Sequence, residues 1–181
     1  FQKFVEDIEE SIKIFKNKLG YNPIYFSYPF GEYNLEQKNY ISNNFEFAFG
    51  QHSGVIDLNK DRYELPRFPI NEKYGEIKRF KEVISYLPLQ YKIIKPENKF
   101  MNDGENPPKM TIEFFKDQKN LENINCFSNE GSKWRKTKIV LIDNILNINF
   151  AEKFNERRGR INCSLKDENG WRFSGFQFVQ N

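Results

Sequence analysis

Apolar residues recur at helical spacing from the first position up to Gly20, a residue typical of helix C-caps. The positions that share one helical face are Phe1, Phe4, Val5, Ile8, Ile12, Phe15 and Leu19. This spacing predicts an amphipathic helix over residues 1–19. The pattern is already running at Phe1, with no initiator Met, capping residue or signal peptide before it, so we expect a carboxyl-terminal part of a longer polypeptide.

Strand-like and helix-like patterns then alternate as far as Pro88, which should stop the last helix. Asn34, with Gln37 three residues on, is typical of a capping box. The predicted strands are 24–28, 45–49 and 65–68, and the predicted helices are 35–43 and 77–87. Such alternation indicates parallel strands covered by helices, in a sheet that we expect to continue upstream of this chain.

The residue composition changes at the polar, turn-rich stretch "KPENKFMNDGENPPK", which predicts a linker at residues 96–108. Short strands without helical period follow it, at 110–115, 124–127, 138–141, 145–150, 160–164 and 171–179. Evenly spaced strands of this kind favour a β-sandwich. The predicted organisation is therefore an α/β domain at 1–95, the linker, and an all-β accessory domain at 109–181.

Composition narrows the choice of partners. The 181 residues carry a net charge of +3, with Lys and Glu interspersed, so the chain is not expected to bind nucleic acid. No apolar run is long enough to cross a bilayer, so no transmembrane segment is expected.

Cys126 and Cys163 are the only cysteines, and they are too far apart for a zinc knuckle. They either form a disulfide, which implies an oxidising compartment, or remain two buried thiols. Pairing is favoured because both lie in predicted strands of the sandwich.

The segment "YFSYPFGEYN" predicts a strand that runs into a sharp turn and then a helix. Pro29 fixes φ and removes a donor, while Gly31 permits backbone geometry closed to other residues. Chemistry tends to sit at the carboxyl ends of strands in α/β folds, although an ordinary turn between strand and helix would show the same pattern.

Three segments together, "SYPFGEYN", "FAFGQHSGVID" and "ELPRFPI", resemble the carboxyl-terminal half of polysaccharide deacetylase domains, the NodB-like carbohydrate esterases of family four. The later segments "ENPPKMTIEF", "INCF" and "GRINCSLKDENGWRFSGFQFV" resemble the β-sandwich appended to some bacterial members. The resemblance implies an α/β plus all-β fold, a partial distorted (β/α) barrel followed by an immunoglobulin-like β-sandwich. It also implies a location in the bacterial periplasm, the cell envelope or outside the cell.

The family removes acetyl groups from N-acetylated sugars of polysaccharides with a bound divalent metal, zinc or another ion. Its ligand motifs, T-F-D-D and H-[ST]-x-x-H, are absent from this sequence and are expected upstream. The resemblance therefore implies a polysaccharide or glycolipid glycan as substrate and an upstream fragment of the same polypeptide as partner. This chain alone is expected to hold no metal.

The family's R-x-P-Y motif corresponds to Ser27, Tyr28, Pro29 and Phe30. The resemblance implies that the Phe30 backbone N–H, aimed by Pro29, donates to the oxyanion, and it makes Tyr28 a candidate substrate contact. Ser27 stands where the family has Arg, so Arg67 is the candidate that supplies a guanidinium instead.

His52 is the only histidine. The family's general acid lies in a later L-x-H motif, and the matching "ELPRFPI" has no His. His52 is thus a candidate substrate contact, with a surface or hydrogen-bonding role as the alternative.

Two further features fit either function or plain structure. Arg157 to Arg160 could touch an anionic polysaccharide or a lipid head group, or form a solvated turn. An aromatic set could stack on sugars or pack in a core: Trp134, Trp171, Phe173, Phe176 and Phe178. The alternative to an enzyme part is a catalytically silent carbohydrate-binding or structural module.

Overall fold

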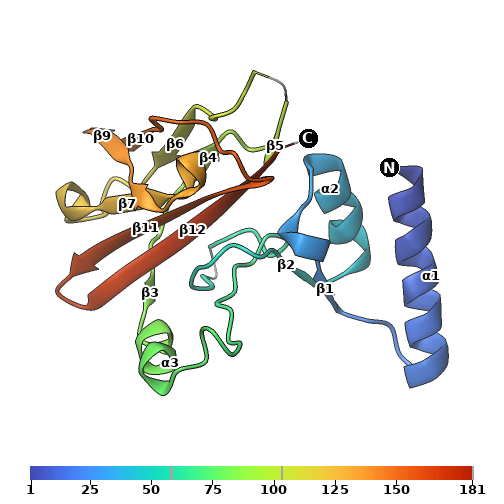
Figure 1. Ribbon diagram of the computed structural model, residues 1–181. Coiled ribbons are helices and arrows are strands. Elements are labelled where there is room, and N and C mark those ends of the chain that lie inside the picture. Colours follow the sequence, from blue (N-terminus) through green and yellow to red (C-terminus); the bar gives the residue numbers. More distant parts are fainter. Residues whose placement is uncertain (58, 103, 181) are drawn as a thin grey trace.

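The computed structural model describes residues 1–57, 59–102 and 104–180 (Figure 1). In the described part of the chain, three α-helices accompany a two-stranded sheet, a four-stranded sheet and a six-stranded mixed sheet. Within the described residues, no sheet closes into a barrel. In Figure 1 the two larger sheets lie on the left, the long hairpin of the six-stranded sheet runs from the lower left toward the middle, and α1 is outermost on the right.

The α/β part begins with α1 (Gln2–Leu19) and α2 (Leu35–Asn44), and both helices end or begin as the sequence predicts. Gly20 adopts φ 82° and its N–H donates to the Lys16 carbonyl at 2.8 Å. Asn34 and Gln37 form a reciprocal capping box, with the Gln37 N–H donating to Asn34 Oδ1 at 2.8 Å. The caps are local side-chain chemistry, which is why the pattern alone located them.

Strands β1 (Tyr25–Ser27) and β2 (Phe47–Phe49) pair in parallel between these helices. The predicted third strand is reduced to a single bridge between Phe49 and Leu65. Pro66 and Pro69 explain the difference, because neither can donate a hydrogen bond to a neighbouring strand.

A small core holds this part together on one face of the two strands. Its buried members are Ile8, Tyr28, Tyr33, Ile41, Phe45 and Ala48. On the other face Tyr25 packs its ring against Phe47 but stays 59% exposed. The two-stranded sheet is thus covered on one side only.

Helix α3 (Ile77–Ile84) is shorter than predicted, and none of its residues is buried. The next residues form β3 (Leu87–Pro88), which pairs in parallel with the start of β12. A residue before proline is biased toward extended geometry, so Pro88 turns Leu87 from the predicted helix into a strand.

The β part consists of two sheets that share one core. The four-stranded sheet orders β4 (Ile93–Lys95), β6 (Met110–Glu113), β10 (Ile145–Asn149) and β9 (Lys138–Ile142). The six-stranded sheet contains β3, β5 (Phe100–Met101), β7 (Asn125–Ser128), β8 (Arg135–Lys136), β11 (Arg158–Asp167) and β12 (Gly170–Gln180). Short 3-10 turns occur at Pro29–Gly31, Leu121–Asn123 and Glu130–Ser132. Ile112, Phe114, Leu146 and Phe178 are fully buried between the sheets.

β pairing starts earlier in the chain than expected. The stretch predicted as a linker contains β5, which pairs with the end of β12, and β3 and β4 precede it. A strand of two residues is too short to show an alternating pattern, so the sequence reads there as turn and loop.

Cys126 and Cys163 form a disulfide between paired positions of β7 and β11. The predicted pairing is thus confirmed, and it is consistent with an oxidising extracellular or periplasmic location. None of the helices that the structure describes is long and apolar enough to cross a membrane.

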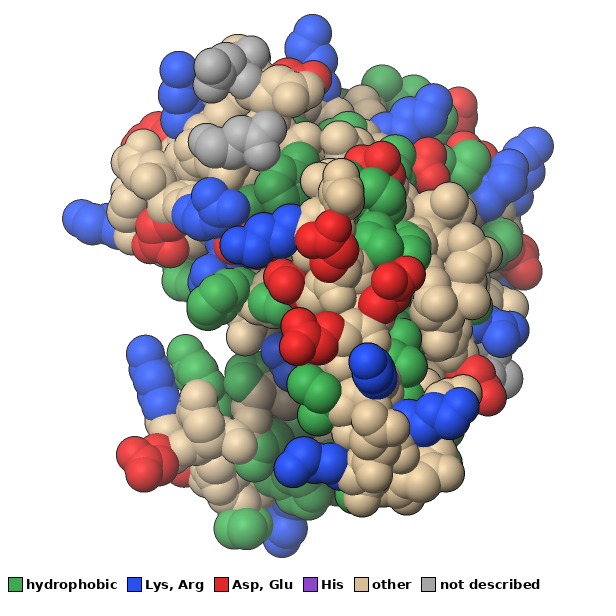
Figure 2. All heavy atoms as spheres, turned by 90° about the vertical axis from the view of Figure 1, so that its right-hand side faces the viewer, with side chains coloured by type: hydrophobic (Ala, Val, Ile, Leu, Met, Phe, Trp, Pro, Cys, Tyr) green, Lys and Arg blue, Asp and Glu red, His purple; other side chains and the backbone are tan. Residues whose placement is uncertain are grey.

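Figure 2 shows the side of the molecule that carries α1, where acidic, basic and apolar side chains are intermixed. The outline is hollowed at the left of that view, between an upper and a lower lobe.

Candidate functional site

The turn that follows β1 has unusual backbone geometry. Phe30 adopts φ 57° and ψ 7°, and Gly31 follows with φ 69°. The left-handed region costs a residue other than glycine about 1–2 kcal/mol. The Gly31 N–H donates to the Tyr28 carbonyl and the Glu32 N–H to the Pro29 carbonyl, so the turn's two hydrogen bonds leave the Phe30 N–H out. Phe30 itself is 63% exposed.

Gly31 is required by space as well as by its φ angle. It is buried, and a Cβ atom added there would lie 2.4 Å from the backbone nitrogen of Gln51. The turn after β1 therefore touches the loop after β2 directly.

The β part grips this turn from the other side through Gln177 on β12. The Gln177 side-chain amide donates to the carbonyls of Phe30 at 3.2 Å and Gly31 at 3.1 Å. The Arg158 guanidinium lies 4.8 Å from the centre of the Phe30 ring. We call Gln177, Arg158 and Glu32 the turn clamp.

Glu32 completes the clamp with a forked ion pair. Its carboxylate accepts from Arg158 Nε at 2.8 Å and from Arg157, whose Nη2 lies 2.9 Å away. Burial alone would raise the pKa of Glu32, but the hydrogen bonds from Arg157 and Arg158 outweigh it and hold that pKa below its ordinary value. The Glu32 carboxylate is therefore ionised at neutral pH.

Tyr28 is a core residue. Only 1% of it is exposed, its ring stacks on Tyr33 at 4.3 Å, and its hydroxyl donates to the Tyr63 carbonyl at 3.0 Å. Burial raises the pKa of Tyr28, with Asp61 and Glu64 adding to the effect. Its side chain has no surface for the substrate contact that the sequence suggested.

A cleft of about 830 Å³ opens beside the turn, between the α/β part and the hairpin β11–β12. We call it the central cleft. Its lining includes Gln51, His52 and Arg67 from the α/β part, and Arg160, Asn162 and Trp134 from the β part. It brings together His52 and Arg67 of the predicted site residues, whereas Pro29 and Phe30 adjoin it only through Gly31 and Gln51.

His52 lines this cleft as a neutral imidazole. A Cβ added to Gly50 would lie 2.7 Å from His52 Nδ1, so the ring packs closely on the Gly50 backbone. Burial, helped by the charges of Lys60 and Lys99, lowers the pKa of His52 to about 3. A histidine with that pKa carries no proton to donate as a general acid at neutral pH, but its ring remains a hydrogen-bonding group.

Arg67 is exposed at the cleft, and its backbone N–H donates to the His52 carbonyl at 3.1 Å. Its guanidinium forms no ion pair with any residue that the structure describes. Ser27 is exposed on β1 and does not line the cleft.

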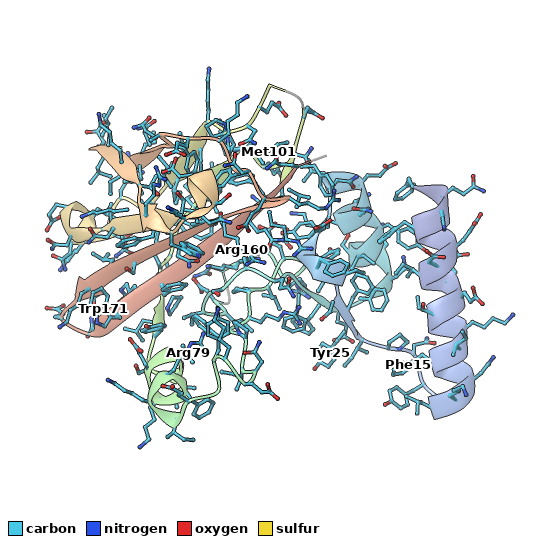
Figure 3. The ribbon with its side chains drawn as sticks, in the orientation of Figure 1. Phe15, Tyr25, Arg79, Met101, Arg160 and Trp171 are labelled. Carbon is cyan, nitrogen blue, oxygen red and sulfur yellow. A yellow bond between two sulfur atoms is a disulfide. The ribbon has the colours of Figure 1, made fainter. Side chains whose placement is uncertain are left out.

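The aromatic set divides between core and surface. Phe176 and Phe178 belong to the sandwich core, and Phe173 stacks on Tyr86 at 5.6 Å. Trp171 lies near the tip of the hairpin (Figure 3), where the Lys166 ammonium lies 5.9 Å from its ring. Trp134 is the member with an open face in the central cleft, 53% exposed.

The arginines between positions 157 and 160 also differ in their surroundings. Arg157 and Arg158 share the single carboxylate of Glu32 as their ion-pair partner. Arg160, whose place on β11 is shown in Figure 3, lines the cleft instead, and its Nε atom is buried without a hydrogen-bond partner among the described residues. Sequence spacing gave no hint of this division, because Glu32 lies far from the arginines along the chain.

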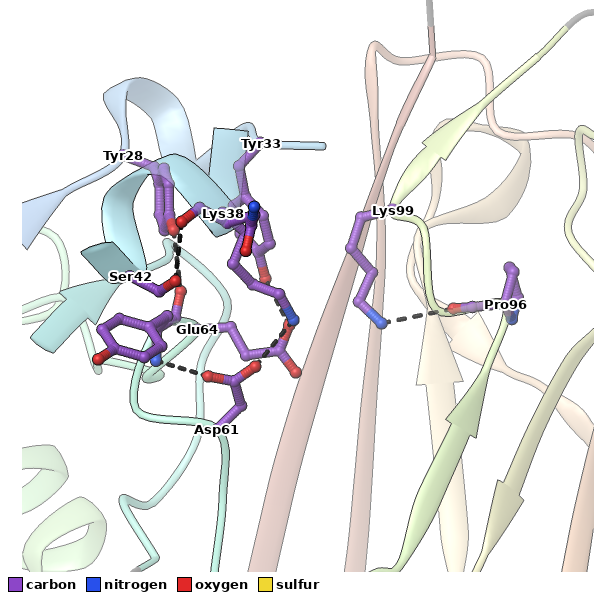
Figure 4. A network of polar contacts seen from close by, with 10 residues as sticks. Tyr28, Tyr33, Lys38, Ser42, Asp61, Glu64, Pro96 and Lys99 are labelled. Carbon is purple, nitrogen blue, oxygen red and sulfur yellow. Dashed lines mark hydrogen bonds and ion pairs between the residues drawn. The ribbon is translucent and has the colours of Figure 1, made fainter. Parts of the chain in front are cut away.

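A second polar network occupies the seam between the two parts (Figure 4). Lys38 lies between Asp61 at 2.8 Å and Glu64 at 3.4 Å, and the Tyr33 hydroxyl donates to Glu64 at 3.1 Å. Lys38, Asp61 and Glu64 border a hollow of about 650 Å³.

Lys60 borders the same hollow. It donates to Ser174 Oγ at 2.8 Å and lies 4.7 Å from the centre of the Tyr91 ring. Burial lowers the pKa of Lys60 to about 8. The contact joins residues 114 positions apart, so no local signal could have found it.

The described residues do not form a donor set for the divalent metal that the resemblance implies. No group of three or more His, Cys, Asp or Glu side chains among them could hold a metal ion. The site residues of this chain are therefore considered without a metal step.

No family model matches this chain, no curated protein is found to be similar to it, and no solved structure matches its fold. Its function is therefore inferred from the turn, the clamp and the cleft.

Proposed function

We propose that this chain is the carboxyl-terminal part of a polysaccharide N-deacetylase, which hydrolyses acetamido groups of N-acetylated sugars. In this proposal residues 1–95 belong to a partial, NodB-like (β/α) barrel, and residues 109–181 form an immunoglobulin-like accessory domain. The enzyme would act in the bacterial periplasm, in the cell envelope or outside the cell, which is consistent with the disulfide.

The left-handed Phe30 carries the proposal. Strained residues other than glycine persist only where the surroundings hold them, and they cluster at functional sites. Here Gly31, Gln177 and the Glu32 ion pairs supply that support. The result is an exposed turn, at the carboxyl end of a parallel strand, whose central N–H is not used by the turn itself.

An N–H in this position would stabilise the oxyanion that forms while an amide is hydrolysed. Water adds to the acetyl carbon as one of its protons leaves, and the carbonyl oxygen becomes an oxyanion. The C–N bond then breaks as the nitrogen takes up that proton, which releases acetate and the protonated sugar amine. A preorganised N–H that donates to the oxyanion lowers the barrier, and loss of one such donor typically costs a factor of about 10²–10³ in kcat. In this proposal Arg67 supplies positive charge beside the reacting group, and His52 is a neutral substrate contact.

The substitution Gly31→Ala tests the role of the turn in the full-length polypeptide that contains this chain. Its Cβ would meet the Gln51 backbone, so we expect the turn to shift and kcat for acetate release from an N-acetylglucosamine oligomer to fall about 100-fold. Gly20→Ala is the matched control, because Gly20 also has positive φ but nothing lies within 4 Å of an added Cβ. Equal turnover in the two folded variants would refute the proposal.

The central cleft favours a second candidate, a catalytically silent carbohydrate-binding module. An open tryptophan and unpaired arginines can bind a glycan without any reaction. Glycan binding by the full-length polypeptide, with no acetate released at any metal supplement tested, would favour this second candidate.

A further inference from the structure

The central cleft has a one-sided charge. Its lining contains Arg67, Arg79 and Arg160, and no Asp or Glu among the residues described. In the chain as a whole basic and acidic residues are nearly balanced, 28 against 25. A concave site lined by one sign of charge concentrates ligands of the opposite sign.

Arg79 is occupied by the protein itself. Its Nη1 atom donates to the carbonyls of Pro69 at 2.9 Å and Tyr74 at 3.0 Å, and its guanidinium lies 4.9 Å from the centre of the Tyr74 ring. Arg79 therefore shapes the wall of the cleft and adds positive charge to it.

Among the described residues, the guanidinium groups of Arg67 and Arg160 have no such partners. Neither forms an ion pair with a described residue, and the buried Nε of Arg160 has no acceptor there. A buried donor left unpaired is costly, and a guanidinium fits a planar carboxylate with two parallel hydrogen bonds. Arg157 and Arg158, a few positions before Arg160, already have their carboxylate in Glu32. Of these three arginines, Arg160 is thus the one without a carboxylate among the described residues, and it lines the cleft.

The remaining lining fits a sugar ring. Trp134 exposes a broad aromatic face, and such a face packs against the C–H face of a pyranose. Gln51 and Asn162 contribute side-chain amides, which can donate to and accept from sugar hydroxyls. The volume of about 830 Å³ is within the range of ligand pockets.

We propose that the central cleft binds an acidic sugar of the polysaccharide, with Arg160 holding its carboxylate, Arg67 adding positive charge to the site and Trp134 packing on its ring. The inference rests on the proposed function for the glycan itself, and it adds that the glycan is anionic. Gln51 lines the cleft and also touches Gly31, so a chain whose acidic sugar occupies the cleft passes close to the Phe30 turn.

Titration calorimetry with two matched ligands tests the inference. The first is a hexasaccharide of alternating glucuronate and N-acetylglucosamine, and the second is the same hexasaccharide with its carboxylates reduced to alcohols. We expect the acidic form to bind at least about tenfold more tightly, and the difference to shrink as NaCl is raised. Equal affinity for the two forms would overturn the inference.

Variants then assign the effect to residues. Arg67→Gln and Arg160→Gln should each weaken binding of the acidic form about tenfold and leave the reduced form nearly unchanged. Arg160→Lys retains the positive charge but lacks the planar guanidinium. If this variant folds normally and still binds the acidic form weakly, the lost guanidinium contact, and not a fold defect, accounts for the loss. Arg62→Gln removes the same charge from an exposed arginine that does not line the cleft, and should change nothing.

The outcomes separate this inference from the proposed function. Acidic-sugar binding that depends on Arg160, in a polypeptide that releases no acetate, would support the cleft and count against the deacetylase. Acetate release with no preference for the acidic ligand would support the deacetylase and count against acidic-sugar binding in the cleft. Binding to phosphatidylglycerol vesicles but not to the hexasaccharide would show that the cleft takes a lipid head group, and would overturn the inference.

Discussion

The β part buries side chains from both of its sheets in one continuous core and adds a disulfide across β7 and β11. The α/β part buries only a short set of residues between two helices and two strands, and leaves Tyr25 and the whole of α3 without cover. Burial of apolar area is the main source of stability, so the two regions should differ in how far they stand alone.

The seam shows how the weaker region is held. The turn clamp, the contact of Lys60 with Ser174 and the bridge between Gly54 and Ser174 all tie loops of the α/β part to the hairpin β11–β12. The elements nearest the proposed chemistry thus depend on the β part for their position. The β part thus supports the turn after β1 from outside the α/β part.

Removing the disulfide should destabilise the β part and cause the largest change in the free energy of unfolding. Cys126→Ala with Cys163→Ala frees a loop of 37 positions in the unfolded chain and should lower the free energy of unfolding by about 3–4 kcal/mol. Both tryptophans lie in the β part, so their fluorescence in urea reports that region, while far-UV circular dichroism at 222 nm reports the helices. If helices outlast the tryptophan signal in the parent protein, the α/β part is the more stable region and the comparison is wrong.

Raising the pH should strengthen the seam through Lys60. Because burial lowers the pKa of Lys60 to about 8 in the folded protein, the unfolded chain binds more protons between pH 8 and the ordinary lysine pKa near 10.5, and stability rises with pH across that window. The gain should be on the order of 2–3 kcal/mol.

Lys60→Met isolates this contribution. The variant should lose the Lys60 part of the rise between pH 8 and 10 in urea titrations, whereas Lys116→Met, at an exposed position, should keep it. Lys99, whose pKa burial also lowers, should add its own contribution to the rise in both variants. An unchanged rise in Lys60→Met would show that its amine is solvated.

Breaking the turn clamp should loosen the α/β part by a smaller amount. Glu32→Gln leaves Arg157 and Arg158 without their carboxylate and should cost about 1–2 kcal/mol. The pKa of Glu32 is lowered in the folded protein, so its contribution is present above the ordinary carboxyl pKa and is lost as the pH falls below it.

Amide hydrogen exchange at pH 7 locates the effect of that variant. Exchange should quicken in the turn after β1 and in α2 but not in β10 or β11, while Glu46→Gln, at an exposed position, should leave all of them unchanged. Faster exchange throughout the sandwich would mean that the two regions unfold as one unit.

Substitution of Phe30 should give the smallest change. Asparagine tolerates the left-handed region and should alter the free energy of unfolding by less than about 0.5 kcal/mol, whereas β-branched Phe30→Ile should lower it by about 1 kcal/mol. Thermal unfolding followed by calorimetry measures both. Equal melting temperatures for the two variants would show that the turn relaxes freely and is not held by the clamp.

Local patterns were sufficient for most elements of this fold. The caps of α1 and α2 and the strands β6, β7, β9, β10, β11 and β12 follow from residue chemistry and alternation within a few positions. Helix α3 and β3 were misplaced around Leu87, because a single proline decided between two patterns there. The strand pattern favours a disulfide, but the fold is needed to establish it. Two cysteines distant in the chain can pair only where their strands are neighbours.

In the candidate site, too, some features follow from local sequence and others depend on contacts between distant segments. The sharp turn at Pro29–Gly31 follows from the residues alone, because proline restricts and glycine frees the backbone where they stand. The fold is needed to show that Tyr28 is core, that Arg157 and Arg158 share the Glu32 carboxylate, and that Arg160 joins Arg67 and Trp134 around a cleft. Burial and charge pairing depend on which distant segments meet, and no spacing along a chain records that.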